Sequence, residues 1–139
     1  MRMAKLTLFK NRPFIRSYHF VDQVPAQYNP QRNPTLLCIH GFPDFWYGWR
    51  YQIGPWVRKG CRVVVPDMLG YGGTDKPDDV SEYSTKKICA DLAALLDLLN
   101  IRKAVCTASC ILRSSQDFIG PHWSRLGCVH RRKVRALAS

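Results

Sequence analysis

No apolar run in the sequence approaches the ~20 residues that a membrane-spanning helix needs, so no membrane segment is predicted. The first ten residues carry charge but lack a continuous apolar stretch, which argues against a secretory signal. A cytoplasmic protein is the resulting expectation. In that compartment the six cysteines are predicted to be reduced thiols rather than a disulfide framework.

The sequence also lacks the spacings that mark metal and nucleotide sites. No two cysteines are separated by two residues, so the cysteines and histidines near the C-terminus form no zinc motif. The glycines at 70, 72 and 73 lack the G-x-G-x-x-G spacing, which predicts a turn rather than a phosphate loop. We expect no metal and no cofactor. The cysteines and histidines that have ligand chemistry but lack zinc-site spacing are Cys106, Cys110, Cys128, His122 and His130.

Acidic residues are scarce: 10 Asp and Glu stand against 21 Lys and Arg. Residues 106–139 hold six of the basic residues and one Asp, so the excess is densest there. Such a patch can bind nucleic acid or anionic lipid electrostatically. No recognition motif accompanies the charge, which favours a solvated tail. We therefore expect no nucleic-acid, membrane or other specific partner.

Apolar patterning predicts an α/β domain, and an apolar content of 46% can fill one core. Short β-branched runs alternate with longer runs of helical period, which favours right-handed βαβ units and a mostly parallel sheet. Residues 106–139 show neither period. The predicted strands are 17–22 (near an edge), 35–40, 61–66 and one beginning at 103–105, the helices are 47–59 and 84–99, and the turns are 27–34 and 69–80.

Three motifs punctuate these elements. His40-Gly41-Phe42-Pro43 ends a predicted strand, and an aromatic-rich run continues to Ile53. Pro66-Asp67-Met68-Leu69-Gly70-Tyr71-Gly72-Gly73-Thr74-Asp75-Lys76-Pro77 follows the next strand, and Tyr83-Ser84 leads into the Leu-rich helix. Over residues 15–105 the chain resembles the α/β-hydrolase fold family, in particular its soluble epoxide hydrolase branch. The length of the first motif makes that resemblance specific.

The resemblance implies a site for opening an epoxide with water to a diol, through an Asp ester and without metal or organic cofactor. Backbone N–H groups after a strand can stabilise the negative oxygen that such chemistry creates. By resemblance the Phe42 N–H is one oxyanion-hole donor, His40 is structural rather than the base, and Asp67 bonds within its loop. The implied oxyanion-hole and pocket residues are His40, Gly41, Phe42, Pro43, Asp44 and Trp46, and the implied structural loop residues are Asp67, Gly70 and Gly72.

The sequence contains neither the family's Gly-His-Asp-Trp-Gly nucleophile turn nor a Gly-x-Ser-x-Gly turn. The catalytic base pair and the cap tyrosines are also not recognisable. We therefore interpret residues 1–105 as the N-terminal part of the hydrolase domain and residues 106–139 as an unrelated basic tail. An inactive chain is expected, with the apolar faces of strands 35–40 and 61–66 partly exposed. Alternatives are a fragment of haloalkane dehalogenase type and a non-enzymatic binding or dominant-negative fragment that uses the tail.

The genetic code offers one explanation of the tail. One allowed back-translation from Ile119, read one base into the Gly120 codon, spells Val-Leu-Ile-Gly-His-Asp-Trp-Gly. Val105-Cys106 can be encoded GTA TGT, which resembles the 5′ end of an intron. The hypothesis is a retained short intron over residues 105–119, followed by an out-of-frame exon over residues 120–139.

Overall fold

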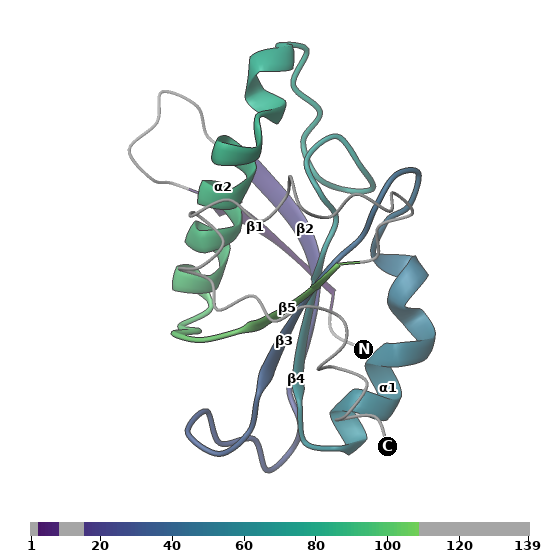
Figure 1. Ribbon diagram of the computed structural model, residues 1–139, viewed down its shortest axis with the longest axis vertical. Helices are drawn as coiled ribbons and strands as arrows, with labels where there is room; N and C mark the ends of the chain where they lie inside the picture. Colours follow the sequence, from purple (N-terminus) through teal and green to yellow (C-terminus); the bar gives the residue numbers. More distant parts are fainter. Residues whose placement is uncertain (1–2, 9–15, 109–139) are drawn as a thin grey trace.

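The computed structural model describes residues 3–8 and 16–108, with side chains from residue 16 onward. Its elements follow one another as strands and helices of a layered α/β fold (Figure 1). In chain order they are β1 (Met3–Leu8), β2 (Arg16–Gln23), β3 (Thr35–Ile39), η1 (Trp46–Trp49), α1 (Arg50–Arg58), β4 (Arg62–Pro66), η2 (Val80–Tyr83), α2 (Thr85–Leu98) and β5 (Val105–Ala108).

The five strands form one mixed sheet in the order β1-β2-β4-β3-β5. The β3 strand is parallel to both neighbours, with Leu37 opposite Val64 of β4 and Cys106 of β5. The β2 strand is antiparallel to β4 and to β1. The chain thus runs from β3 to its neighbour β4. From β4 it passes back over β3 to β5, which lies next to β3 on the side away from β4. Two right-handed crossovers in opposite directions place their helices on opposite faces.

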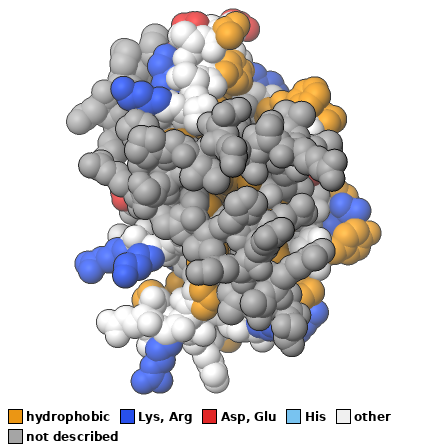
Figure 2. Space-filling view, viewed as in Figure 1, with side chains coloured by type: hydrophobic (Ala, Val, Ile, Leu, Met, Phe, Trp, Pro, Cys, Tyr) orange, Lys and Arg blue, Asp and Glu red, His pale blue; other side chains and the backbone are white. Residues whose placement is uncertain are grey.

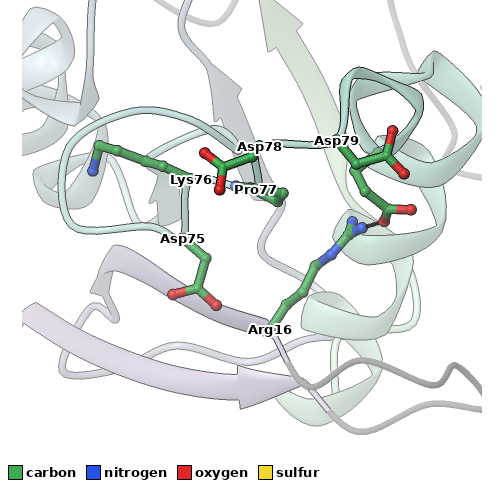
Figure 3. A pocket seen from close by; sticks show the side chains of 7 residues that line it. Arg16, Asp75, Lys76, Pro77, Asp78 and Asp79 are labelled. Atoms are coloured by element: carbon green, nitrogen blue, oxygen red, sulfur yellow. Dashed lines mark ion pairs between the residues drawn. The ribbon is translucent and has the colours of Figure 1, made fainter.

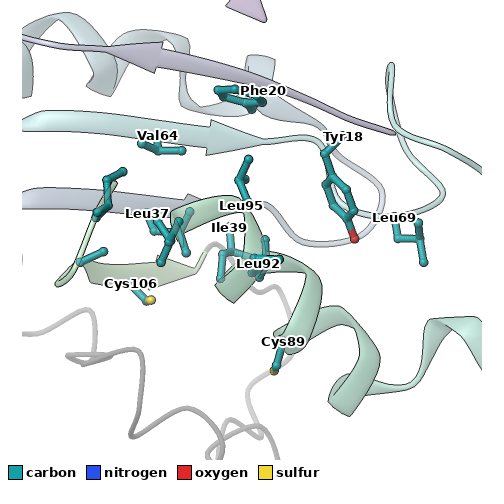
Figure 4. Packing of buried hydrophobic residues seen from close by; sticks show 14 residues of the cluster. Tyr18, Phe20, Leu37, Ile39, Val64, Leu69, Cys89, Leu92, Leu95 and Cys106 are labelled. Atoms are coloured by element: carbon teal, nitrogen blue, oxygen red, sulfur yellow. The ribbon is translucent and has the colours of Figure 1, made fainter. Parts of the chain in front are cut away.

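The core is accordingly split by the sheet. On one face α2 packs Leu92 and Leu95 against Tyr18, Phe20 and other side chains of the sheet (Figure 4). On the other face Trp49 and Ile53 pack against the side chains of β3 and β4 that point to that face, among them Leu36, Val63 and Val65. Each central strand is apolar on both faces because a helix covers each face.

Most predicted elements are confirmed with small shifts. The helix predicted at 47–59 begins as the 3₁₀ turn η1 and continues as α1 through Pro55. Ser84 is the N-cap of α2, and its carbonyl accepts from Ile88 N at 3.0 Å, although its side chain makes no cap bond. The strand expected near an edge is β2, one position in from β1.

Two expectations change. The regular pattern does not stop at Val105, because β5 continues to Ala108 in register with β3. The expected exposure of strands 35–40 and 61–66 is wrong: Leu37, Cys38 and Val64 are fully buried. Their neighbours β2 and β5 and the two helices supply the cover that the sequence pattern did not reveal. Residues 109–139 of the predicted tail lie outside the described residues.

The described helices include none that is both long and apolar enough to cross a membrane.

Candidate functional site

Two loops leave the carboxyl ends of adjacent parallel strands. Residues 40–46, the His40 loop, connect β3 to η1, and residues 67–79, the Asp67 loop, connect β4 to η2. The first runs to α1 and the second toward α2, on opposite faces of the sheet. The carboxyl ends of parallel strands are where α/β proteins bind ligands. All nine sequence-predicted site residues lie in these two loops or at the start of η1.

His40 joins the two loops. Its Nε2 accepts a hydrogen bond from the Met68 N–H at 2.8 Å, so that nitrogen carries a lone pair. The proton therefore lies on Nδ1, which donates to the Gly41 carbonyl at 2.9 Å. The ring is buried and meets the Tyr71 ring edge-on at 5.3 Å. Both nitrogens are committed to backbone groups, which leaves His40 no free position for proton transfer.

Asp67 makes a second connection between the loops. Its Oδ1 accepts from Trp46 N at 2.8 Å, and its Oδ2 accepts from Gly73 N at 3.0 Å. Oδ2 also lies 2.8 Å from His19 Nδ1 of β2. With 1% of the residue exposed, the carboxylate depends on these donors in place of water. A carboxylate held in this way cannot reach a substrate carbon, so its geometry fits a structural role.

The Asp67 loop needs glycine at two of the predicted positions. Gly72 has φ +50°, and a Cβ there would lie 2.0 Å from Asp67 Oδ2. Gly70 has φ +90°, and a Cβ there would lie 2.9 Å from the Tyr83 ring. Only glycine combines this backbone conformation with so close an approach. Both residues therefore shape the turn around Asp67.

The tip of the His40 loop faces solvent. Phe42 is 74% exposed, and its ring contacts Tyr71 edge-on at 6.4 Å. The Phe42–Pro43 peptide is cis. Among the described residues the Phe42 N–H has no hydrogen-bond acceptor. The half-buried Gly41 precedes it at the end of β3. An unpaired N–H on a braced loop can receive a negatively charged oxygen.

Asp44 and Trp46 complete the loop. Asp44 Oδ1 accepts from Phe45 N at 2.8 Å, and Gly48 leaves room for this carboxylate, because a Cβ there would lie 2.1 Å from Asp44 Oδ2. Trp46 begins an aromatic cluster in which the Trp46 and Tyr47 rings meet edge-on at 5.4 Å.

The cluster continues onto α1, where the Arg50 guanidinium carbon lies 4.3 Å and 4.2 Å from the ring centres of Tyr47 and Tyr51. Figure 2 shows hydrophobic and basic side chains next to one another at the right-hand edge of the view.

A buried charge cluster beneath the Asp67 loop was not predicted. Arg16 of β2 bonds Asp91 of α2 at 2.5 Å and also pairs with Glu82 of η2. Tyr18 donates to the same Asp91 oxygen at 3.1 Å. Asp91 falls between Ile88 and Leu95 on the apolar face of the helix, and that position was the sequence signal that it is buried. These bonds tie η2 and α2 to the sheet.

Above this cluster lies a pocket of about 450 Å³ lined mostly by charged side chains of the Asp67 loop (Figure 3). Arg16 at its floor is directed toward its ion-pair partner Glu82. The remaining lining residues are Asp75, Lys76, Pro77, Asp78 and Asp79. Asp75 is itself engaged, because its Oδ2 accepts from Ser17 N at 2.7 Å.

The described residues contain no group of three or more metal-ligating side chains placed to hold an ion. Cys106 is buried in β5, whereas Cys110, Cys128, His122 and His130 lie outside the described residues. Burial raises the pKa of the Cys38 thiol far above its usual range, and burial also raises that of Cys61. Neither thiol is therefore activated as a nucleophile.

Comparison with known proteins agrees with this architecture. A family model described as the alpha/beta hydrolase fold matches residues 34–111, more than half of the chain. "Bifunctional epoxide hydrolase 2" of Mus musculus is 34% identical over 133 residues, which cover 92% of this chain and 20% of that protein. "Epoxide hydrolase 2" of Siraitia grosvenorii is 44% identical over 68 residues, covering 49% of this chain and 22% of that protein.

Solved structures give the same result. An epoxide hydrolase from Vigna radiata superposes with a TM-score of 0.63 at 30% identity, covering 78% of this chain and 32% of that one. Epoxide Hydrolase A from Mycobacterium thermoresistibile gives a TM-score of 0.63 at 29% identity, covering 77% and 31%. The chain thus spans about a fifth to a third of the length of these relatives.

Proposed function

The chain belongs to the α/β-hydrolase fold family and is similar to its epoxide hydrolases, and from this premise we propose that it forms one wall of an epoxide-opening site. The His40 loop supplies one oxyanion donor, the Phe42 N–H. His40, Asp67 and the glycines of the Asp67 loop hold that donor in place. Gly41, Pro43, Asp44 and Trp46 shape the loop around it. The substrate class is a small-molecule epoxide, and water is the second reactant.

One observation carries the proposal: the loop is braced from two sides around the Phe42 N–H, which has no acceptor in the part of the chain that the structure describes. Met68 N–H binds His40 at 2.8 Å before the tip, and Asp67 binds Trp46 N–H at 2.8 Å after it. A donor fixed in advance stabilises developing charge without the cost of reorganisation. Removing one such donor from a working site lowers kcat by about 10²–10³-fold.

A chimera tests this role. Residues 16–108 of this chain would replace the corresponding segment of the Vigna radiata epoxide hydrolase, which supplies the rest of the fold. Phe42→Pro removes the N–H, whereas Phe42→Ala removes only the ring. We expect Phe42→Pro to lower kcat by about 10²-fold or more relative to Phe42→Ala. Equal kcat values for the two variants would remove Phe42 from the oxyanion role.

We propose further that this chain alone does not turn over epoxides. Its sequence holds no Gly-His-Asp-Trp-Gly turn, and among the described residues Asp67 and His40 are committed to structural bonds. A nucleophile and a base are required to form and hydrolyse the ester. The purified chain should give no diol from styrene oxide above the buffer blank, with the intact Vigna radiata enzyme as positive control. Diol formation above the blank that follows chain concentration would contradict this.

A further inference from the structure

His19 of β2 belongs to none of the three motifs, yet it lies against the residue that braces the His40 loop. Its carbonyl accepts from Asp67 N at 2.9 Å, and its Nδ1 lies 2.8 Å from Asp67 Oδ2. We propose that His19 is a positioning residue that controls the His40 loop through the Asp67 carboxylate. What the loop does chemically rests on the proposed function, whereas the chain of contacts does not.

The contacts run through one carboxylate with two differently engaged oxygens. Oδ1 holds the Trp46 N–H at 2.8 Å, while Oδ2 holds His19 and, at 3.0 Å, the Gly73 N–H. A carboxylate turns about its Cβ–Cγ bond, so donors on one oxygen fix the direction of the other. Without His19, Oδ2 keeps only the Gly73 N–H among its present partners. The bond to Trp46 then loses its alignment.

The chemistry also fixes the form of the His19 ring. An ionised carboxylate only accepts hydrogen bonds, so Nδ1 must carry the proton in this contact. Nε2 has no partner among the described residues, and 20% of the side chain is exposed. His40 shows the opposite arrangement, because both of its ring nitrogens bond backbone groups. Substitution of His19 therefore removes its bond to Asp67 without breaking any described bond between its ring and the backbone. Substitution of His40 would break two such bonds.

The backbone around His19 is held separately from its ring. His19 N donates to Thr74 Oγ1 at 3.1 Å, and Thr74 in turn donates to the Asp67 carbonyl at 2.7 Å. These bonds survive a change of the His19 side chain. A substitution should therefore loosen the carboxylate without detaching β2 from the Asp67 loop.

The test follows backbone amides by NMR hydrogen exchange in the full chain. His19→Leu removes the donor, and His19→Asn places an amide donor near the position of Nδ1. We expect His19→Leu to speed exchange at Trp46 and Gly73 by about tenfold or more, with Met68, held by His40, within about twofold. His19→Asn should restore most of the protection. Asp91→Ala serves as the control, because a loss of global stability speeds all three amides together.

Unchanged exchange at Trp46 in His19→Leu, or equal acceleration at Met68, would overturn the proposal. If His19→Leu does not fold, the tautomer of His19 in the wild-type chain provides the test. Long-range ¹⁵N NMR should show the proton on Nδ1, whereas a His19 ring protonated only on Nε2 would refute the hydrogen bond to Asp67 and with it the proposal.

Failure of the proposed function leaves a separate signature. If Phe42→Pro and Phe42→Ala are equal in the chimera while the amide result holds, His19 still positions the loop but the loop is not an oxyanion donor.

Discussion

Among single residues, Arg16 is a buried charge that is paired with two carboxylates, those of Asp91 and Glu82. Its side chain and that of Asp91 are 7% and 8% exposed, and they are joined at 2.5 Å. Asp91→Ala leaves the buried guanidinium with Glu82 and without its Asp91 partner. Breaking a buried pair on one side costs about 3–5 kcal/mol, so the free energy of unfolding in urea should fall by that order.

Asp78→Ala provides the matched control for Asp91→Ala, because Asp78 is an exposed carboxylate beside the same pocket. It should change the free energy of unfolding by no more than about 0.5 kcal/mol. A similar fall in the free energy of unfolding of both variants would mean that the buried Arg16–Asp91 pair stabilises the fold no more than an exposed carboxylate does.

Two glycines allow a second comparison at this scale. Gly72→Ala forces a Cβ into a left-handed residue and against Asp67, so it should destabilise by at least ~1–2 kcal/mol. Gly54→Ala lies inside α1 with only the flexible end of Arg58 near it, at 3.3 Å. It should stabilise by about 0.5–1 kcal/mol, because alanine loses less backbone entropy in a helix. Thermal melts of both variants give the two signs, and a stabilised Gly72→Ala would show that the loop can rearrange.

At the scale of elements, the carboxylate of Asp79 caps the N-terminus of η2. Hydrogen bonds from the Ser81 backbone N–H and hydroxyl lower the pKa of Asp79, the N-cap of η2. A lowered pKa means that the cap stabilises the fold above the unfolded-state pKa and is lost as the pH falls through the folded-state pKa. Ser81→Ala keeps the larger, backbone contribution. An NMR titration of Asp79 should therefore show its pKa rising only part of the way toward the ordinary value.

The same scale shows what the sequence could and could not predict. The β3 and β4 strands are recognisable as short, continuous apolar runs because both of their faces are buried, and α2 is recognisable because its buried residues recur at helical spacing. The β1 strand alternates polar and apolar residues over Lys5-Leu6-Thr7-Leu8, a signal that could have predicted it, and antiparallel pairing with β2 places it in the sheet. The last three residues of β5 are not distinguishable from the tail by sequence, because a strand of four residues is too short to show a period.

The site divides in the same way. The positions of His40, Phe42 and Asp67 followed from motifs after strand ends. Tyr71, which packs on both His40 and Phe42, belongs to the motif that begins at Pro66, but nothing local predicts these contacts, and His19 lies outside the motifs altogether. Contacts between side chains far apart in sequence depend on strand register, which no local pattern encodes.

For the molecule as a whole, Cys38 reports on cooperativity. It lies on the inner strand β3 with no exposed surface, on the face of the sheet that α1 covers, and burial raises its pKa. The thiolate is the reactive form, so labelling requires opening of the sheet. In a Cys110→Ser/Cys128→Ser background, disulfide-reagent labelling of Cys38, read by mass spectrometry, should rise with urea in parallel with loss of circular dichroism. Fast labelling before that transition would indicate local opening at β3.

The gene itself tests the hypothesis about residues 105–139. If an intron is retained, the nucleotide sequence read one base into the Gly120 codon encodes Gly-His-Asp-Trp-Gly. A spliced transcript then joins Ala104 directly to the exon that encodes this turn, and the residues that form β5 in this chain are replaced. Sequencing genomic DNA and transcripts across this region gives the answer. Any other reading in that frame ends the hypothesis and leaves the tail as native sequence.

The braces on the His40 loop have a consequence for the order in which the protein is made. Every described contact to His40 and Trp46 that crosses between the two loops comes from Asp67, Met68 or Tyr71, and His19 precedes them all. A ribosome delivers the chain from its N-terminus, and early parts can form structure while later parts are still being added. The loop can therefore be set in its shape before the residues that follow β5 have left the ribosome.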